Sequence, residues 1–273
     1  MKRIFIVLLS LAVFSFHVQA QPEKSGVIQF ESIFDPAALT LANGIKLSEE
    51  ATARIPKRSI TSFELLFNQA KASYKQAADA GLHKNNHGNS IRYGGLGVFG
   101  GGISKDYYYS FGDHKLTQVF KLNDTLLLME DKLGMPPFIV VNDSHPVPLI
   151  EYVKTDSIKD ILGFNCHQVV VKTTVKRKIQ GVEREITNQV ILWYTHELGF
   201  DFSPNPVLWT EGAVLAIEGK GTKIEAKSMQ YKAVNTRDLE LPEKGIIISQ
   251  DQLRAKIDLR VKQIRLSRIG SWN

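Results

Sequence analysis

The chain has 273 residues, of which 43% are hydrophobic, and its formal net charge is +6. This length suits one large domain or two smaller ones, and it allows a sizeable buried core. The positive excess is mild, whereas nucleic-acid readers concentrate basic residues in one patch, so we expect no nucleic-acid partner.

The first twenty residues have the pattern of a secretory signal. Lys2 and Arg3 precede an apolar run over residues 4–16, and residues 18–20 place small side chains before Gln21. The run is shorter than the roughly 20 apolar residues that span a membrane. We expect cleavage before Gln21 and no transmembrane helix afterwards. Because Gln21 is not a cysteine, we expect an exported protein, periplasmic or associated with the outer membrane, that is not a lipoprotein.

Alternating apolar and polar side chains predict many short β-strands. Before and between them, a short helix is expected after Ser48, which can cap it, and before Pro56, which ends it. A short apolar run at residues 138–141 is bracketed by prolines and suits an edge strand or an irregular crossover. The predicted strands are 26–31, 60–67, 70–76, 107–111, 115–122, 125–130, 149–155, 168–175, 185–194, 214–217 and 223–234.

Two further segments depart from the strand pattern. Residues 78–104 are rich in Gly, Asn and His and predict a long, mobile surface loop. Residues 250–268 show helical spacing after a capping box of Ser249 and Gln252. This amphipathic helix either docks its apolar face on the sheet or lies on a membrane as a peripheral contact. The predicted fold is mainly β: a single domain over residues 21–273, with a large curved antiparallel sheet or half-barrel and a C-terminal amphipathic helix.

Two sequence motifs resemble known cofactor-binding or catalytic motifs, but the residues around them do not fit those functions. Residues 95–100 match a dinucleotide fingerprint, but a polar loop precedes them and β-prone tyrosines follow, so we expect no cofactor. His196-Glu197 begins like a metalloprotease motif, but Phe200 stands where the second His belongs. We identify no catalytic residue and leave the question of enzymatic activity open, with binding favoured.

Two histidines and the single cysteine are considered as metal ligands and as a reactive thiol, respectively. His83 and His87 lie four residues apart and are the candidate metal ligands, but the segment lacks helical periodicity and a third ligand. A solvated loop is the favoured explanation for this segment. Cys166 is the only cysteine, so the chain forms no internal disulfide; it is either a small buried side chain or a reactive thiol.

The densest aromatic region suggests a ligand-binding site at Trp193, Tyr194 and Trp209. Along a strand, Tyr194 and Trp193 face opposite ways, and both faces of this strand are apolar, which indicates cover on both sides. Core packing explains the three aromatic residues, and so does an apolar ligand cavity inside a curved sheet.

Four blocks of the sequence resemble the GLPGLI family of exported proteins from Gram-negative bacteria. They are residues 65–67 with Ser73 and Tyr74, residues 161–166, the Leu-Trp-Tyr-Thr run at 192–195, and residues 209–215, where Gly212 matches the naming motif. The chain would be a divergent member. The resemblance implies an envelope location and a β-rich fold similar to the half-barrels of periplasmic lipoprotein carriers. It implies no established catalytic residues.

Three functions follow as hypotheses. The first is a non-enzymatic envelope protein that binds an apolar ligand or an envelope protein through its curved sheet. The second is a metal-binding protein that uses His83, His87 and His114. The third is a hydrolase whose residues are assembled from distant strands.

Overall fold

The computed structural model describes residues 24–42, 48–55, 58–77, 105–122, 124–134, 149–179 and 182–253, together with Ala255, Lys256 and Leu259. The expected signal segment, the predicted loop at 78–104 with His83 and His87, and the apolar run at 138–141 lie outside these residues.

Twelve strands form one sheet, which confirms the predicted mainly β fold. The strands lie in the order β12-β6-β5-β4-β3-β2-β1-β11-β10-β9-β8-β7. Their bounds are β1 Gly26–Phe34, β2 Ser59–Phe67, β3 Lys71–Gln76, β4 Lys105–Ser110, β5 Lys115–Leu122, β6 Thr125–Lys132, β7 Leu149–Ile161, β8 Phe164–Ile179, β9 Val182–Thr195, β10 Ala213–Gly219, β11 Thr222–Tyr231 and β12 Ile246–Ile247.

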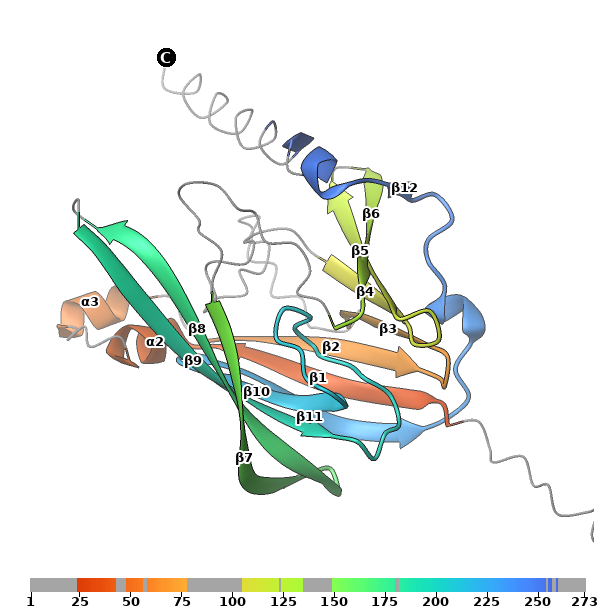
Figure 1. The fold of residues 1–273 in the computed structure, drawn as a ribbon, viewed down its shortest axis with the longest axis horizontal. Helices are drawn as coiled ribbons and strands as arrows, with labels where there is room; N and C mark the ends of the chain where they lie inside the picture. The colour runs from red at the N-terminus through yellow and green to blue at the C-terminus, as the bar shows by residue number, and fades with distance from the viewer. Residues whose placement is uncertain are drawn as a thin grey trace, which may run out of the picture.

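The order describes two antiparallel meanders that meet in the middle of the sheet. The chain runs outward from β1 to β6, crosses to β7 at the opposite edge, and returns inward to β11. There β11 pairs with β1, from Gly26 opposite Tyr231 to Phe34 opposite Thr222. Figure 1 shows these two strands side by side at the centre of the sheet. Among the described strands, β12 departs from the predicted antiparallel pairing, since it runs parallel to β6; an isolated parallel bridge also joins Phe202 and Ala213.

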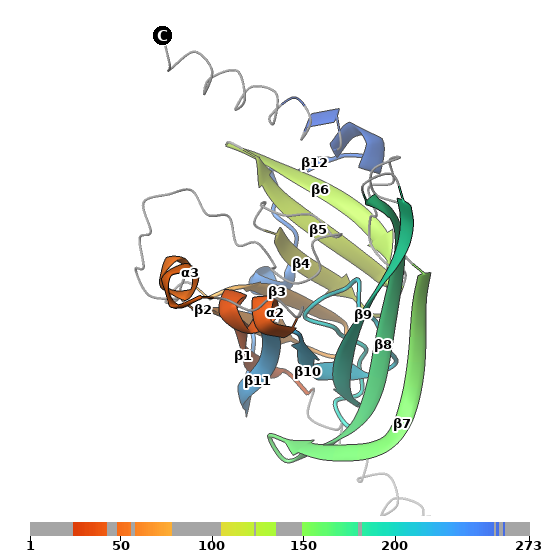
Figure 2. The same cartoon turned by 90° about the vertical axis from the view of Figure 1, so that its left-hand side faces the viewer.

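The sheet is curved and open, as expected for a half-barrel. Figure 2 shows β4–β6 and β7–β9 as two walls bending to the same side, with the loop between β9 and β10 inside the curve. The inner face carries the main core, which includes Phe30, Phe63, Tyr74 and Leu192. On the outer face, Tyr108, Val119 and Leu128 form a smaller cluster.

Helices are few among the described residues. Helix α2 (Pro36–Ala42) and helix α3 (Glu49–Arg54) lie between β1 and β2, and the 3-10 helix η2 (Thr236–Leu239) follows β11. Helix α3 lies where the helix after Ser48 was predicted, whereas α2 was not predicted. Within the described parts of the chain, no helix is long and apolar enough to span a membrane.

The capping box predicted for the C-terminal helix is confirmed. The Gln252 side chain accepts a hydrogen bond from the Ser249 backbone N–H at 2.9 Å, and the Ser249 hydroxyl accepts one from the Gln252 N–H at 3.3 Å. Described helical residues begin at 250. Leu253 is only 1% exposed and packs with Phe120, Leu127 and other residues of the inner face. The start of this helix therefore docks on the sheet; its predicted continuation to residue 268 lies outside the described residues.

The end of the β7–β8 hairpin bends away from the rest of the sheet. The register shifts between Lys154 and Ile158, which marks a bulge in β7. Beyond it, Ile161 pairs with Phe164 across a two-residue turn in which Leu162 has φ 59° and Gly163 has φ 84°. Turns of this kind match the twist of a hairpin but require positive φ, which favours Asn or Gly over Leu. In Figures 1 and 2 this end of β7 crosses beneath the sheet.

Candidate functional site

The three predicted ligand residues lie in different surroundings. Trp193 and Tyr194 are consecutive on β9 and are 8% and 5% exposed. Because side chains alternate along a strand, Tyr194 shares the inner face with Leu192, and Trp193 points to the outer face. Trp209 lies in the loop between β9 and β10 and is partly buried against the main core. A single cavity lined by all three would have to cross the sheet.

The β9–β10 loop packs its aromatic side chains against the inner face. Phe202 is fully buried, with ring centroids 5.7 Å from Phe30, 5.4 Å from Tyr74 and 5.3 Å from Tyr109. Phe200 stacks with Phe111 at 5.0 Å. Core packing, one of the two explanations offered by the sequence for this aromatic region, therefore holds for these phenylalanines.

Hydrogen bonds fix the loop to the sheet. The Tyr109 hydroxyl donates to the Ser203 carbonyl at 2.9 Å, and the Ser203 hydroxyl donates to the Leu208 carbonyl at 2.7 Å. The N–H of Val214 donates to the Phe202 carbonyl at 2.8 Å. These buried bonds make the loop a fixed part of the core, because breaking them would leave polar groups unpaired away from water.

Trp209 joins this loop to both walls of the sheet. A Cβ placed on Gly134, just after β6, would lie 3.1 Å from the Trp209 indole nitrogen, so the indole packs on that glycine. On the other side is Tyr152 of β7. Burial raises the pKa of the Tyr152 hydroxyl, and a hydrogen bond with the Trp209 backbone opposes that rise.

Polar side chains surround Tyr194 near the end of β9. Its ring lies 5.9 Å from that of His167 and 5.3 Å from that of His196. Nearby, the ammonium of Lys154 pairs with the carboxylate of Glu211. This hydrogen bond lowers the pKa of Glu211, which keeps the carboxylate charged. The charged pair joins β7 to the β9–β10 loop; the hydrolase hypothesis stays a prediction.

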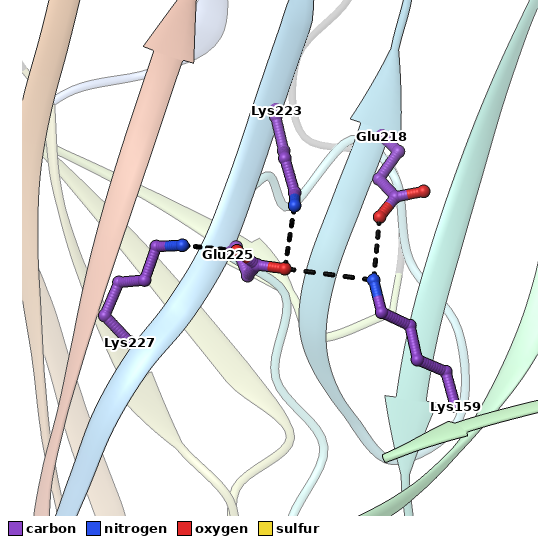
Figure 3. Close-up of polar contacts among 5 residues, drawn as sticks. All are labelled: Lys159, Glu218, Lys223, Glu225 and Lys227. Carbon is purple, nitrogen blue, oxygen red and sulfur yellow. Dashed lines mark hydrogen bonds and ion pairs between the residues drawn. The ribbon is translucent and has the colours of Figure 1, made fainter. Parts of the chain in front are cut away.

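A network of five charged residues lies on the outer face (Figure 3). The Lys159 ammonium is 3.0 Å from a Glu218 oxygen and 3.8 Å from a Glu225 oxygen. Glu225 also pairs with Lys223, at 2.8 Å, and with Lys227. Since β8 and β9 lie between β7 and β10 in the sheet, Lys159 reaches Glu218 and Glu225 only because the bent end of β7 passes over them. We call this set the Lys159 network.

Trp193 lies beneath the Lys159 network. Its cross-strand neighbour is Ala216, whose own neighbour is Glu225, so the three form one row across the outer face. The Lys159 ammonium lies 5.5 Å from the centre of the Trp193 ring, within the range of a cation–π contact. The Trp193 indole N–H is buried and has no hydrogen-bond partner among the described residues. Such a group is rare in folded proteins and calls for an explanation.

Cys166 is fully buried on the strand that neighbours Trp193. Burial raises the pKa of its thiol to about 12, and the carboxylates of Asp160 and Glu197 add to the shift. A thiol with so high a pKa carries almost no thiolate at neutral pH, so this environment favours the buried structural role over the reactive one.

The described residues provide no cluster of side chains that supports the metal-binding hypothesis. Within them, no three His, Cys, Asp or Glu side chains gather closely enough to hold a metal ion. His114 is exposed in the turn between β4 and β5, with φ 48°. His83 and His87 lie outside the described residues, so their role stays a prediction.

Strand β7 forms one edge of the sheet in the part of the chain that the structure describes. It has 13 residues, whereas β12 at the other edge has two. From Leu149 to Lys154 its pairing with β8 is regular. Leu149 and Val153 are 61% and 44% exposed. Sequence reasoning identified this strand but not its place at the edge, because strand order depends on long-range pairing.

Comparisons with known proteins leave the family open. No protein-family model matches the chain, and no curated protein matches it. Two solved structures of PNGF-II, in different space groups, are similar to it at 15% and 13% identity, with TM-scores of 0.49 and 0.48. Each match covers 85% of this chain and 32% of the PNGF-II chain, so this chain spans about a third of that protein's length. A likeness this distant carries no argument about function.

Proposed function

We propose that the chain is a non-enzymatic, exported protein of the cell envelope that binds a protein partner through the open edge of its curved sheet. The N-terminal signal pattern and the blocks that resemble the GLPGLI family support the location. The observation that carries the binding role is the edge strand β7, whose first six residues, Leu149–Lys154, pair regularly with β8 and with no other strand among the described residues.

The chemistry of this edge suits strand addition. An extended peptide can pair with the outward N–H and C=O groups of an edge strand, while alternate side chains set specificity. Natural proteins usually protect such edges with short strands, bulges or charges. Here the bulge after Lys154 protects only the second half of β7, and exposed Leu149 and Val153 flank Glu151 in the first half.

The protein version of the binding hypothesis has more support than a ligand inside the curve. Phe200 and Phe202 of the β9–β10 loop already cover the inner face near β1, β3 and β4. An apolar ligand there would compete with side chains of the chain itself, which are held by buried hydrogen bonds.

A photo-crosslinking amino acid at Leu149 tests the proposal in cells that export the protein. We expect a discrete adduct from this position and none from the same group at Ile60, which is 57% exposed on the central strand β2. Ile60 lies in the same cross-strand row of the outer face as Val153, but its strand is paired on both sides. A crosslinker at Ile60 therefore measures the adducts expected from surface exposure alone.

Blocking the edge supplies the decisive comparison. Val153→Lys should abolish the Leu149 adduct, because a lysine at an open edge opposes strand addition. Ile60→Lys makes the same chemical change away from the edge and should leave the adduct intact. Equal adducts from both crosslinking positions, or an adduct that survives Val153→Lys, would contradict edge binding.

A further inference from the structure

The bent end of the β7–β8 hairpin covers Trp193 from outside the sheet. Ile161 and Cys166 of this end belong to the same buried core as Trp193. Cys166 is opposite Lys159 in the hairpin, and Lys159 contacts the Trp193 ring. The outer face at this point therefore has a second layer, built by the chain folding back over itself.

Apolar packing and ion pairs hold that second layer to the sheet: Ile161 and Cys166 are 6% and 0% exposed, and Lys159 pairs with Glu218 and Glu225. Lys159 makes both ion pairs, and the side chains of Lys159, Glu218 and Glu225 are 36%, 32% and 16% exposed. Ion pairs at this degree of exposure contribute on the order of 0–1 kcal/mol each.

Lifting the hairpin end leaves the remaining ladder of β8 and β9 paired, but it exposes Ile161 and Cys166 and breaks the hydrogen bond from the Asn165 N–H to the Glu197 carboxylate at 3.0 Å. An alkyl chain that takes the place of these contacts against the indole offsets the loss of buried apolar surface.

The groups beneath the cover are complementary to an anion with an apolar body. The Trp193 N–H is a buried donor without an acceptor among the described residues. The Lys159 network holds three ammonium groups and two carboxylates, so it keeps one positive charge in excess. Ile161, Cys166 and the face of the indole supply apolar surface around this donor and charge.

We propose that Trp193 and Lys159 form a binding site for an amphipathic carboxylate, covered by the end of the β7–β8 hairpin. The carboxylate accepts the hydrogen bond that the indole N–H lacks and pairs with Lys159, while the alkyl chain lies against Ile161 and the indole. Glu218 and Glu225 act as a latch, because they hold Lys159 when no ligand is bound. This site is separate from the first half of β7 and stands independently of edge binding.

Calorimetric titration of the purified protein with decanoate, below its micelle-forming concentration, tests the site. We expect saturable binding by decanoate, and binding at least about tenfold weaker by decanol and by decyltrimethylammonium, because hydrogen bonds to charged groups are the strong ones. Absence of saturable binding, or equal binding of the three probes, would overturn the proposal.

Variants separate the donor, the cation and the latch. Trp193→Phe keeps the apolar ring without the N–H, and Lys159→Gln removes the cation; each should weaken decanoate binding about tenfold. Glu218→Gln combined with Glu225→Gln frees Lys159 and should tighten binding by up to about fivefold, since the pairs lost are partly exposed to solvent. Thermal melting of each variant confirms that it is folded.

Lys227→Gln is the matched control for Lys159→Gln. It removes the same charge and another ammonium that pairs with Glu225, but this lysine is on β11, whereas the cation over the Trp193 ring is Lys159. Decanoate affinity should stay within about twofold of the unmodified protein, the expectation for an exposed ion pair away from the ligand. Equal losses in the two lysine variants would show a general charge effect and refute the site.

Discussion

The two walls of the sheet differ in how much of each strand is buried. Strands β1–β6 have six to nine residues, and their inner side chains form an aromatic core around Phe202. Strands β7–β9 have 13, 16 and 14 residues and extend past that core. Exposed apolar side chains such as Leu149, Ile158 and Val182 lie on this second wall. The comparison indicates that the first wall supplies stability, whereas the second has surface left for contacts.

Truncating one apolar side chain that packs against the first wall and one on the second wall tests this division most directly. Phe202→Ala removes a fully buried ring and should lower the free energy of unfolding by about 3–5 kcal/mol. Val182→Ala removes a side chain that is 58% exposed and should change it by less than about 0.5 kcal/mol. Thermal or denaturant unfolding measures both. Comparable losses would show that the second wall is as tightly integrated as the first.

A pair of glycines extends the comparison to the backbone. Gly212 and Gly163 have nearly the same φ, 85° and 84°. A Cβ on Gly212 would lie 2.6 Å from the Thr195 carbonyl oxygen, whereas a Cβ on Gly163 meets nothing within 4 Å. Gly212→Ala should therefore cost at least about 2 kcal/mol of unfolding free energy, through strain and overlap. Gly163→Ala should cost only about 1 kcal/mol, through φ alone; equal losses would contradict this.

The hairpin turn of the second wall offers a stabilising change. Leu162 has φ 59° and is 40% exposed, so its conformation is unfavourable and little burial compensates. Leu162→Asn should raise the free energy of unfolding by up to about 1 kcal/mol, because Asn tolerates positive φ in such turns. The expected rise in Tm is about 2–4 °C. Leu162→Ala, which removes the same apolar group without this tolerance, should show no gain.

Acid should weaken the ion pairs of Glu225 on the outer face of β11 and lower the stability slightly. Burial opposes ionisation of Glu225, but hydrogen bonds from Lys223 and Lys227 outweigh it and lower the pKa of this carboxyl from its ordinary value of 4.5. Because the pKa is lower in the folded state, the stabilisation is complete above that ordinary value and disappears as pH falls through the folded pKa. Tm measured across this acidic range should fall less steeply in Glu225→Gln. If Tm depends on pH equally steeply in Glu225→Gln and in the unmodified protein, Glu225 does not contribute to the acid sensitivity.

Local patterns predicted the strands well and their ends less well. The pattern at residues 115–122 predicted β5 with the correct first and last residues, because alternating hydrophobic side chains indicate a strand that is buried on one face. The prediction for β7 stopped at residue 155, whereas the strand continues to Ile161 beyond the bulge. Exposed polar residues after a bulge carry no periodic pattern, so only the pairing partner Phe164–His167 defines them.

The candidate site was less accessible to sequence reasoning. Alternation correctly separated Trp193 from Tyr194, but nothing local indicated that the loop with Phe202 would fill the inner face. Lys159, Glu218 and Glu225 come from three strands and meet through the bend in β7. A single lysine in a polar strand looks the same whether it is solvated or reaches across two neighbouring strands.

The seam between β1 and β11 has a consequence for how the protein folds. Each meander can form early, since its hairpins join neighbours in sequence, but Gly26 meets Tyr231 only when almost the whole described chain is present. Proteins dominated by such distant pairings fold slowly, in the range of milliseconds to seconds. Until the seam closes, β1 and β11 each offer an unpaired edge of nine or ten residues. The central strands of the finished sheet are thus the most vulnerable to misassembly while it forms.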